Sequence, residues 1–225
     1  MSFGCRLLAA IAMAALLAGS PALAFDTPLS EEAIREAYFL GQRRDDTLAH
    51  FLDKYTWYLA APKSGPKIAS VTFFTPYALV AQESSQRSAG YSAQQAQIDH
   101  RGRAESVRII VQILLTDSYG AFTAVPTGSR SGAAVGYVPR PYDFWKDFDV
   151  RVFNSSAEDA QPLRPFSSRG EPNVSCSEEG GCSLIGATLY FDFAAERFER
   201  GDAFIDIVPP EGEPVSLDLD LAGLR

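Results

Sequence analysis

The sequence has little of the chemistry that enzymes most often use. It holds only two histidines, His50 and His100, and we interpret both as surface residues, since His100 lies in the charged run 99–103. The H-E-x-x-H spacing of zinc hydrolases, the G-x-S-x-G turn of serine hydrolases and glycine-rich phosphate loops are all missing from the sequence. We therefore assign no catalytic residue and expect neither a metal ion nor a cofactor.

Positive charge is scarce as well. Lysine and arginine number 20 against 28 acids, so the formal net charge is −8. Nucleic acids and anionic membrane surfaces are bound by clustered basic residues. The composition therefore argues against both as partners, and we expect the partner to be a protein or a glycan. A hydrophobic content of 46% is ordinary for a globular chain and argues against extensive disorder.

The longest apolar run is short. Residues 7–18 follow Arg6 and make up about a dozen residues, too few for a permanent membrane-spanning helix. A Gly-Ser-Pro break comes next, and residues 22–24 (Ala-Leu-Ala) have the small-x-small pattern that signal peptidase cleaves. We predict a secretory signal over residues 1–24 and a mature chain that starts near Phe25. This chain would be secreted or periplasmic, with no stable membrane anchor after cleavage.

Only two cysteines are expected in the mature chain. Cys5 is removed with the predicted signal, so Cys176 and Cys182 remain. An isolated pair in an oxidising compartment forms a disulfide by default, and the Gly-Gly between these two favours a turn. We predict a structural disulfide that closes a hairpin tip and contributes about 2 kcal/mol. The C-x-x-C spacing of redox motifs is absent.

The first mature segment, residues 25–60, has a helical pattern. Ser30 is a suitable N-cap, acids follow it, and apolar residues recur three or four positions apart. The charged run at residues 43–46 marks a break, which predicts an N-terminal helical hairpin; one long bent helix is the alternative. Residues 61–67 contain two prolines and a glycine and are predicted to form a linker.

From residue 68 the pattern changes to short alternating segments typical of strands. The predicted strands are residues 68–80, 107–116, 148–153, 187–193, 203–208 and 215–221. One short helix, residues 92–98, is expected among them. A succession of strands joined by turn signals predicts a mainly β domain over residues 68–225, built as an antiparallel β-sandwich.

Two stretches resemble known proteins. The strand, Pro/Gly turn and strand of residues 203–221 resemble the last hairpin of an immunoglobulin-like sandwich. Residues 29–38 (Leu-Ser-Glu-Glu-Ala-Ile-Arg-Glu-Ala-Tyr) resemble the start of uncharacterised exported bacterial proteins. The first resemblance implies an immunoglobulin-like fold, and the second implies no function.

The region most typical of a binding site is residues 117–146. It is long, rich in Gly, Ser and Pro, and reads as a loop without regular structure between two strands. Aromatic rings interleaved with arginines can stack on a sugar or a peptide and hold a carboxylate. The candidate binding residues are Tyr137, Arg140, Tyr142 and Trp145. The alternative is that the rings fold inward and fix the loop to the sheet.

These observations favour an exported, non-enzymatic binding or assembly module. One alternative is a secreted polysaccharide hydrolase that acts through two carboxylates, and another is a structural component of a surface assembly. The acids in strand-like segments are Asp192, Asp206, Asp218 and Asp220. Their alternation with apolar residues predicts a solvated sheet face rather than a catalytic pair.

Overall fold

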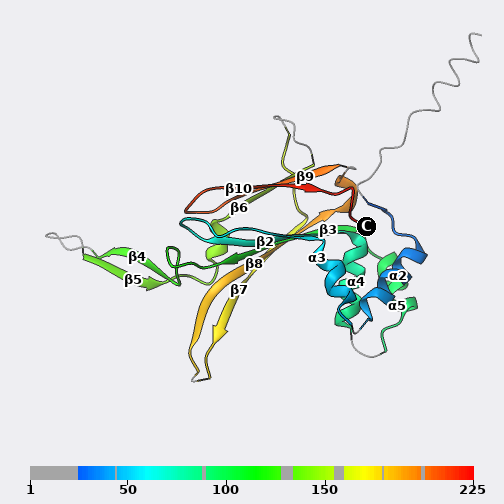
Figure 1. Ribbon diagram of the computed structural model, residues 1–225, viewed down its shortest axis with the longest axis horizontal. Coiled ribbons are helices and arrows are strands. Elements are labelled where there is room, and N and C mark those ends of the chain that lie inside the picture. The colour runs from blue at the N-terminus through cyan, green and yellow to red at the C-terminus, as the bar shows by residue number, and fades with distance from the viewer. Residues whose placement is uncertain are drawn as a thin grey trace, which may run out of the picture.

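The computed structural model describes residues 25–43, 45–87, 90–127, 134–154, 160–178, 180–198 and 201–225 (Figure 1). The predicted signal, residues 1–24, lies outside the described residues. The described chain is mainly β and its sheets are antiparallel, as the sequence pattern predicts. Helices gather at one end of the sheets (Figure 1).

Two sheets form the body of the protein. The five-stranded sheet has the order β1 (Thr56–Tyr58), β2 (Lys67–Phe74), β3 (Ser106–Leu114), β8 (Cys182–Ala194) and β7 (Ser167–Cys176). The three-stranded sheet has the order β10 (Val215–Asp220), β9 (Asp202–Val208) and β6 (Asp149–Phe153). A separate two-stranded hairpin consists of β4 (Phe122–Thr127) and β5 (Ala134–Pro139). The predicted final hairpin is confirmed, because β9 pairs with β10 around residues 209–214.

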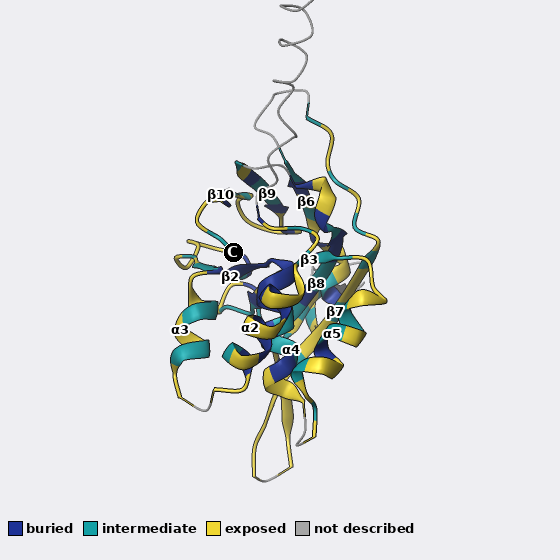
Figure 2. Cartoon of the chain, turned by 90° about the vertical axis from the view of Figure 1, so that its right-hand side faces the viewer, coloured by how far each residue is buried: buried dark blue, intermediate teal, exposed yellow. Residues whose placement is uncertain are grey.

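One hydrophobic core joins the two larger sheets (Figure 2). Val111 of β3 and Leu189 of β8 belong to the same buried cluster as Ile205 of β9 and Leu219 of β10. In β3 and β9 the buried residues alternate with more exposed ones, which is what packing on one face requires. β3 lies in the interior of its sheet, between β2 and β8, as its apolar sequence predicts.

In the residues that the structure describes, the helical layer consists of four helices at one end of the five-stranded sheet, where α4 packs against β2 and β3. These are α2 (Glu31–Gly41), α3 (Thr47–Asp53), α4 (Pro76–Gln86) and α5 (Ala93–Arg101). The Ser30 hydroxyl caps α2 by accepting a hydrogen bond from the amide of Ala33, as predicted. α2 packs chiefly against α4 and α5 rather than against α3. Residues 25–60 therefore hold two helices and also β1, the outer strand of the sheet.

The prediction of one strand-like segment over residues 68–80 is wrong in its second half. β2 ends at Phe74, and Pro76 starts α4. The Thr75 hydroxyl accepts a hydrogen bond from the amide of Ala78, and a proline at the first helical position loses no hydrogen bond. The helix buries Tyr77 and Leu79. A short apolar segment of this kind has the same residue types in a buried helix as in a buried strand, which is why the sequence suggested a strand. The other predicted helix, residues 92–98, is confirmed by α5 with Ser92 as its N-cap.

The prediction that His100 is a surface residue is also wrong. Its Nε2 lies 2.8 Å from a carboxylate oxygen of Glu105, and both side chains are largely buried. Glu105 also accepts hydrogen bonds from the Thr27 hydroxyl and the Leu29 amide. This carboxylate therefore ties the start of the described chain to the connection between α5 and β3. Burial alone would raise the pKa of Glu105, but these hydrogen bonds outweigh burial and lower the pKa.

We predict that Gly41→Ala destabilises the helical layer. A Cβ at position 41 would overlap the carbonyl oxygen of Ala81, where α2 and α4 are in close contact. Forcing a methyl group into a packed contact costs about 1–3 kcal/mol. Gly223→Ala is the matched control, because a Cβ there meets no atom within 4 Å. Denaturant unfolding of both variants checks this, and equal midpoints would contradict the close contact.

We predict that Glu105→Gln removes stability at neutral pH and little at acid pH. Because the folded state lowers the pKa of Glu105, its carboxylate stabilises the fold above the ordinary value of 4.5, and this contribution disappears as the pH falls through the lowered pKa. The loss at pH 7 should be about 1–3 kcal/mol. Urea unfolding at neutral and acid pH measures the difference. The exposed Glu213→Gln serves as control.

Candidate binding surface

The prediction of an irregular loop over residues 117–146 is wrong, because this region contains the β4–β5 hairpin. The two strands are in register from Phe122 opposite Pro139 to Thr127 opposite Ala134. Each strand is rich in β-branched and aromatic residues, which favour a pleated ladder. The Gly- and Ser-rich residues 128–133 between them lie outside the described residues. The hairpin projects from the body at the end away from the helices (Figure 1).

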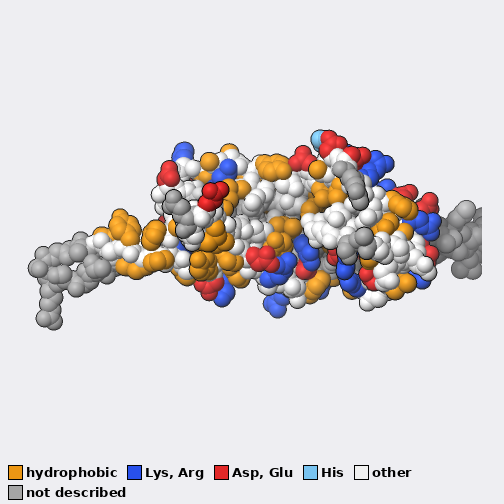
Figure 3. All heavy atoms as spheres, turned by 90° about the horizontal axis from the view of Figure 1, so that it is seen from below, with side chains coloured by type: hydrophobic (Ala, Val, Ile, Leu, Met, Phe, Trp, Pro, Cys, Tyr) orange, Lys and Arg blue, Asp and Glu red, His pale blue; other side chains and the backbone are white. Residues whose placement is uncertain are grey.

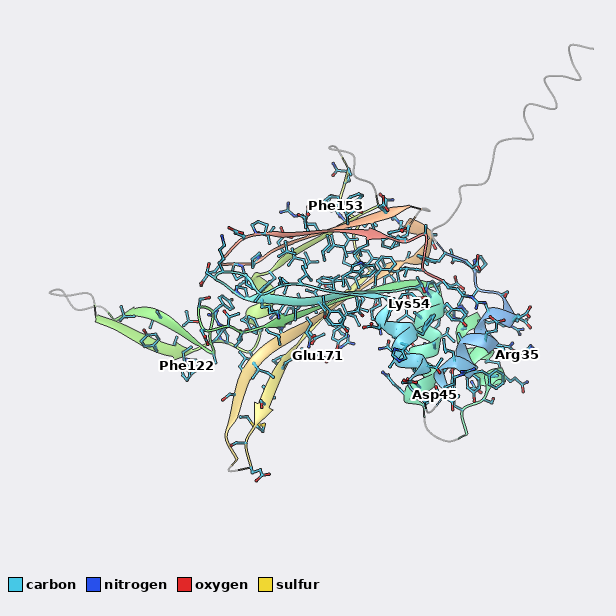
Figure 4. The ribbon with its side chains drawn as sticks, viewed as in Figure 1. Arg35, Asp45, Lys54, Phe122, Phe153 and Glu171 are labelled. Atoms are coloured by element: carbon cyan, nitrogen blue, oxygen red, sulfur yellow. A yellow bond between two sulfur atoms is a disulfide. The ribbon has the colours of Figure 1, made fainter. Side chains whose placement is uncertain are left out.

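One face of the hairpin is apolar and exposed. Residues directly opposite each other in an antiparallel pair share a face. Tyr137 therefore shares its face with Ala124, and Phe122 with Pro139. Tyr137 is 73% exposed, Phe122 62% and Val135 57%. Figure 3 shows hydrophobic side chains gathered on this projection, and Figure 4 labels Phe122 on it.

The hairpin strands also lack charge and have free edges. Neither Phe122–Thr127 nor Ala134–Pro139 contains an acidic or basic residue. Within the described part of the chain, β4 and β5 pair only with each other, so each strand leaves one edge unpaired. Proteins usually protect such edges with charged side chains or cover them with another element. An uncharged, uncovered ribbon is therefore a surface suited to binding another molecule.

The base of the hairpin is fixed by aromatic packing and hydrogen bonds. The Arg140 amide donates to the carbonyl of Ala121, and its Nε donates to the carbonyl of Gly120. Its guanidinium lies 3.5 Å from the centre of the Tyr119 ring. Burial raises the pKa of Tyr119, and the nearby Arg140 opposes this rise. Since the Tyr119 ring packs against the buried Phe144, the base is anchored in the main core.

Trp145 lies on the short 3-10 helix η2 (Phe144–Asp147) and packs against β7. Its indole occupies the space that a Cβ at Gly170 would need. A cleft of about 210 Å³ opens beside the indole, with Phe148, Leu189 and Phe191 among its apolar lining residues. We call this the Trp145 cleft.

The structure thus separates the four residues predicted to bind. Tyr137 is exposed on the hairpin face, and Tyr142 is exposed after β5. Arg140 lies in the base of the hairpin, and Trp145 is half-buried beside its cleft. Among the described residues, no aromatic or cation–π contact joins two of these four. The alternative interpretation, in which the rings of residues 117–146 fold inward, applies to Tyr119 and Phe144, because both are buried.

The candidate binding residues chosen from the sequence did not include Phe122 and Val135, which share the exposed face with Tyr137. The sequence pattern could have identified these two residues. Apolar residues recur at every second position on both sides of residues 128–133, and no charge interrupts either run. The high glycine, serine and proline content of the region masks this two-residue period.

A second hollow lies against α5, and three of its lining residues are acidic. It has a volume of about 60 Å³ and is lined in part by Glu83, Asp99, His100 and Glu105. Each of these carboxylates has a partner: Arg103 for Glu83, Tyr91 for Asp99 and His100 for Glu105. In the part of the chain that the structure describes, no three His, Cys, Asp or Glu side chains are grouped closely enough to hold a metal ion.

The prediction of a solvated face for the strand acids is wrong for Asp192. This residue is buried and accepts hydrogen bonds from Arg108 on the neighbouring strand, with Nε 2.7 Å from Oδ1. Asp218 and Asp220 are exposed on β10, as the alternation predicts. The Cys176–Cys182 disulfide is formed and closes the tip of the β7–β8 hairpin.

No protein-family model matches the chain, and no curated protein matches it significantly. Separately, none of the helices in the described residues is both long and apolar enough to cross a membrane.

We predict that Gly170→Ala displaces Trp145 and exposes its indole. The added Cβ would overlap the indole ring, so the ring must leave β7. In a Trp57→Phe background Trp145 is the only tryptophan, so its fluorescence should shift to the red and become easier to quench. The Gly223→Ala variant in the same background should match the parent. An unchanged spectrum for Gly170→Ala would contradict the packing described here.

Proposed function

We propose that the protein is an exported binding or assembly module that recognises a partner protein through the apolar face of its β4–β5 hairpin. The observation that carries this proposal is the exposure of Phe122, Val135 and Tyr137 on one uncharged ribbon. Large aromatic side chains dominate the energetics of protein interfaces. Because the base of the hairpin is fixed, binding would cost less ordering entropy than for a flexible loop.

We further propose that the body is an immunoglobulin-like β-sandwich preceded by the helical pair α2 and α3. The orders β2-β3-β8-β7 and β10-β9-β6 correspond to the A-B-E-D and G-F-C sheets of a constant-type immunoglobulin domain. The helices α4 and α5 then lie in the A–B connection. The β4–β5 hairpin lies in the B–C connection, at an end of the sandwich where loops of this fold commonly bind ligands.

Export is supported by the disulfide and by the predicted signal. The bond between Cys176 and Cys182 is at an exposed hairpin tip. Such bonds persist in oxidising compartments and are rare in the cytosol. We therefore place the module in the periplasm or outside the cell.

A photo-crosslinking residue at position 137 tests the binding surface. Position 58 is a matched control, because Tyr58 is also a tyrosine on a strand and is also 73% exposed. Irradiation of the host cells should give a discrete protein cross-link from position 137 and none from position 58. Equal products from both positions, or cross-links from position 137 to lipid alone, would contradict the proposal.

A further inference from the structure

We infer that the outer face of the five-stranded sheet binds an uncharged polysaccharide along a row of polar side chains that crosses all five strands. We call this the polar row, and its members are Tyr58, Ser70, Gln112, Thr188 and Glu171. The row lies on different strands from the β4–β5 hairpin, so this inference is independent of the protein-binding surface proposed above.

The register of the sheet brings the five side chains into one line. Ser70 lies opposite Tyr58 on one side and opposite Gln112 on the other. Thr188 in turn lies opposite Gln112 and Glu171. Residues directly opposite each other share a face, and neighbouring strands are about 4.8 Å apart, so the row is about 19 Å long. This length suits an extended chain rather than one small molecule.

The polar row lies on the face of the sheet that points away from the main core. Val71 and Val111, which neighbour members of the row in sequence, are buried in that core, and successive side chains of a strand point to opposite faces. The helical layer covers one end of this face, where Phe74 and Ile110 pack into it. Gln112, in the middle of the row, is exposed. Figure 3 views the molecule from this side.

Hydrogen bonds between strands hold the polar side chains in place. The Ser70 hydroxyl donates to the side-chain oxygen of Gln112 at 3.3 Å. Because this bond uses the oxygen, the two N–H groups of the Gln112 amide remain available to a ligand. The side-chain amide of Asn173 donates to the Thr188 hydroxyl at 3.1 Å. A ligand therefore meets donors and acceptors that are already ordered, which lowers the entropy cost of binding.

The charges on this face cancel locally. Glu171 is the one charged member of the polar row, and it forms an ion pair with Arg169 on the same strand. The Arg169 guanidinium also lies 3.9 Å from the centre of the Tyr190 ring. The row thus presents neutral hydroxyl and amide groups on a protein with a net charge of −8. A neutral chain of hydroxyl groups complements this surface, whereas the net charge repels an anionic polymer.

The composition of the polar row favours a glycan over a protein. The cores of protein interfaces are enriched in aromatic residues, Met and Arg and depleted in Ser and Glu. The row has one aromatic residue, Tyr58, at its end. The Tyr58 ring is 73% exposed, and its hydroxyl donates to Asp53 at 3.1 Å, which fixes the ring beside the row. Its apolar ring face can pack on a sugar ring, while the remaining members exchange hydrogen bonds with sugar hydroxyl groups.

Affinity electrophoresis in native gels tests the inference. The gels contain laminarin, soluble starch or glucomannan as neutral polysaccharides, or polygalacturonate as the anionic one. At least one neutral polysaccharide should retard the protein, and polygalacturonate should not. Gln112→Ala and Thr188→Val each remove hydrogen-bonding groups from the row, so each should weaken binding about three- to tenfold. Gln161→Ala is the matched control, because Gln161 is an exposed glutamine between β6 and β7, and it should bind like wild type.

Three results would overturn the inference. Retardation by none of the neutral polysaccharides would show that the face is not a glycan site. Wild-type affinity in both row variants would place the polysaccharide elsewhere on the protein. Equal retardation by polygalacturonate would contradict an uncharged ligand. Thermal unfolding verifies that each variant folds, and Gln112→Glu replaces Gln112→Ala if the smaller side chain prevents folding; the added charge should also weaken binding. None of these results changes the cross-linking expected from position 137, so the two proposals can fail separately.

Discussion

The structure depends on one constraint: the inward-facing side chains of two sheets must fill a single core. Val111 on β3 and Ile205 on β9 are both fully buried in that core. A shift of one residue in either strand would turn its apolar side chains outward, so this packing also fixes the register of the sheets. The other face of the five-stranded sheet is then free to take the helical layer. There Phe74 and Ala78 join a separate, smaller cluster with Tyr55.

The same core extends to the base of the projecting hairpin. Tyr119 and Phe144 are members of the main cluster, and each lies at one end of the segment that contains β4 and β5. The core therefore fixes both ends of this segment, while the strands between them carry their apolar face outward. Exposure of Tyr137 on the hairpin and burial of Tyr119 at its base are thus two parts of one arrangement. The buried ring holds the direction of the hairpin, and the exposed ring is available to a partner.

Local pattern predicts the parts of this fold that depend on neighbouring residues in the chain. The alternation in β3, β6, β9 and β10, the Ser30 cap and the disulfide could all be predicted this way. Features that depend on contacts between residues far apart in the chain could not be predicted in this way. His100 contacts Glu105, whose carboxylate also accepts a hydrogen bond from the Thr27 hydroxyl 78 residues away, and Asp192 is paired with Arg108, 84 residues away. The hairpin was missed for a different reason, since its glycines and prolines are typical of loops as well as of strand ends.

An uncharged ribbon with two free edges is normally a hazard, because any extended chain can pair with it in many registers. In this protein the fixed base of the hairpin limits that freedom. The Arg140 amide and Nε donate hydrogen bonds to Ala121 and Gly120, so the direction in which the ribbon projects is set within the chain. The formal net charge of −8 also opposes close contact between copies of the chain. The uncharged ribbon is therefore presented in one direction from an acidic protein, which favours a specific partner over pairing of the chain with itself.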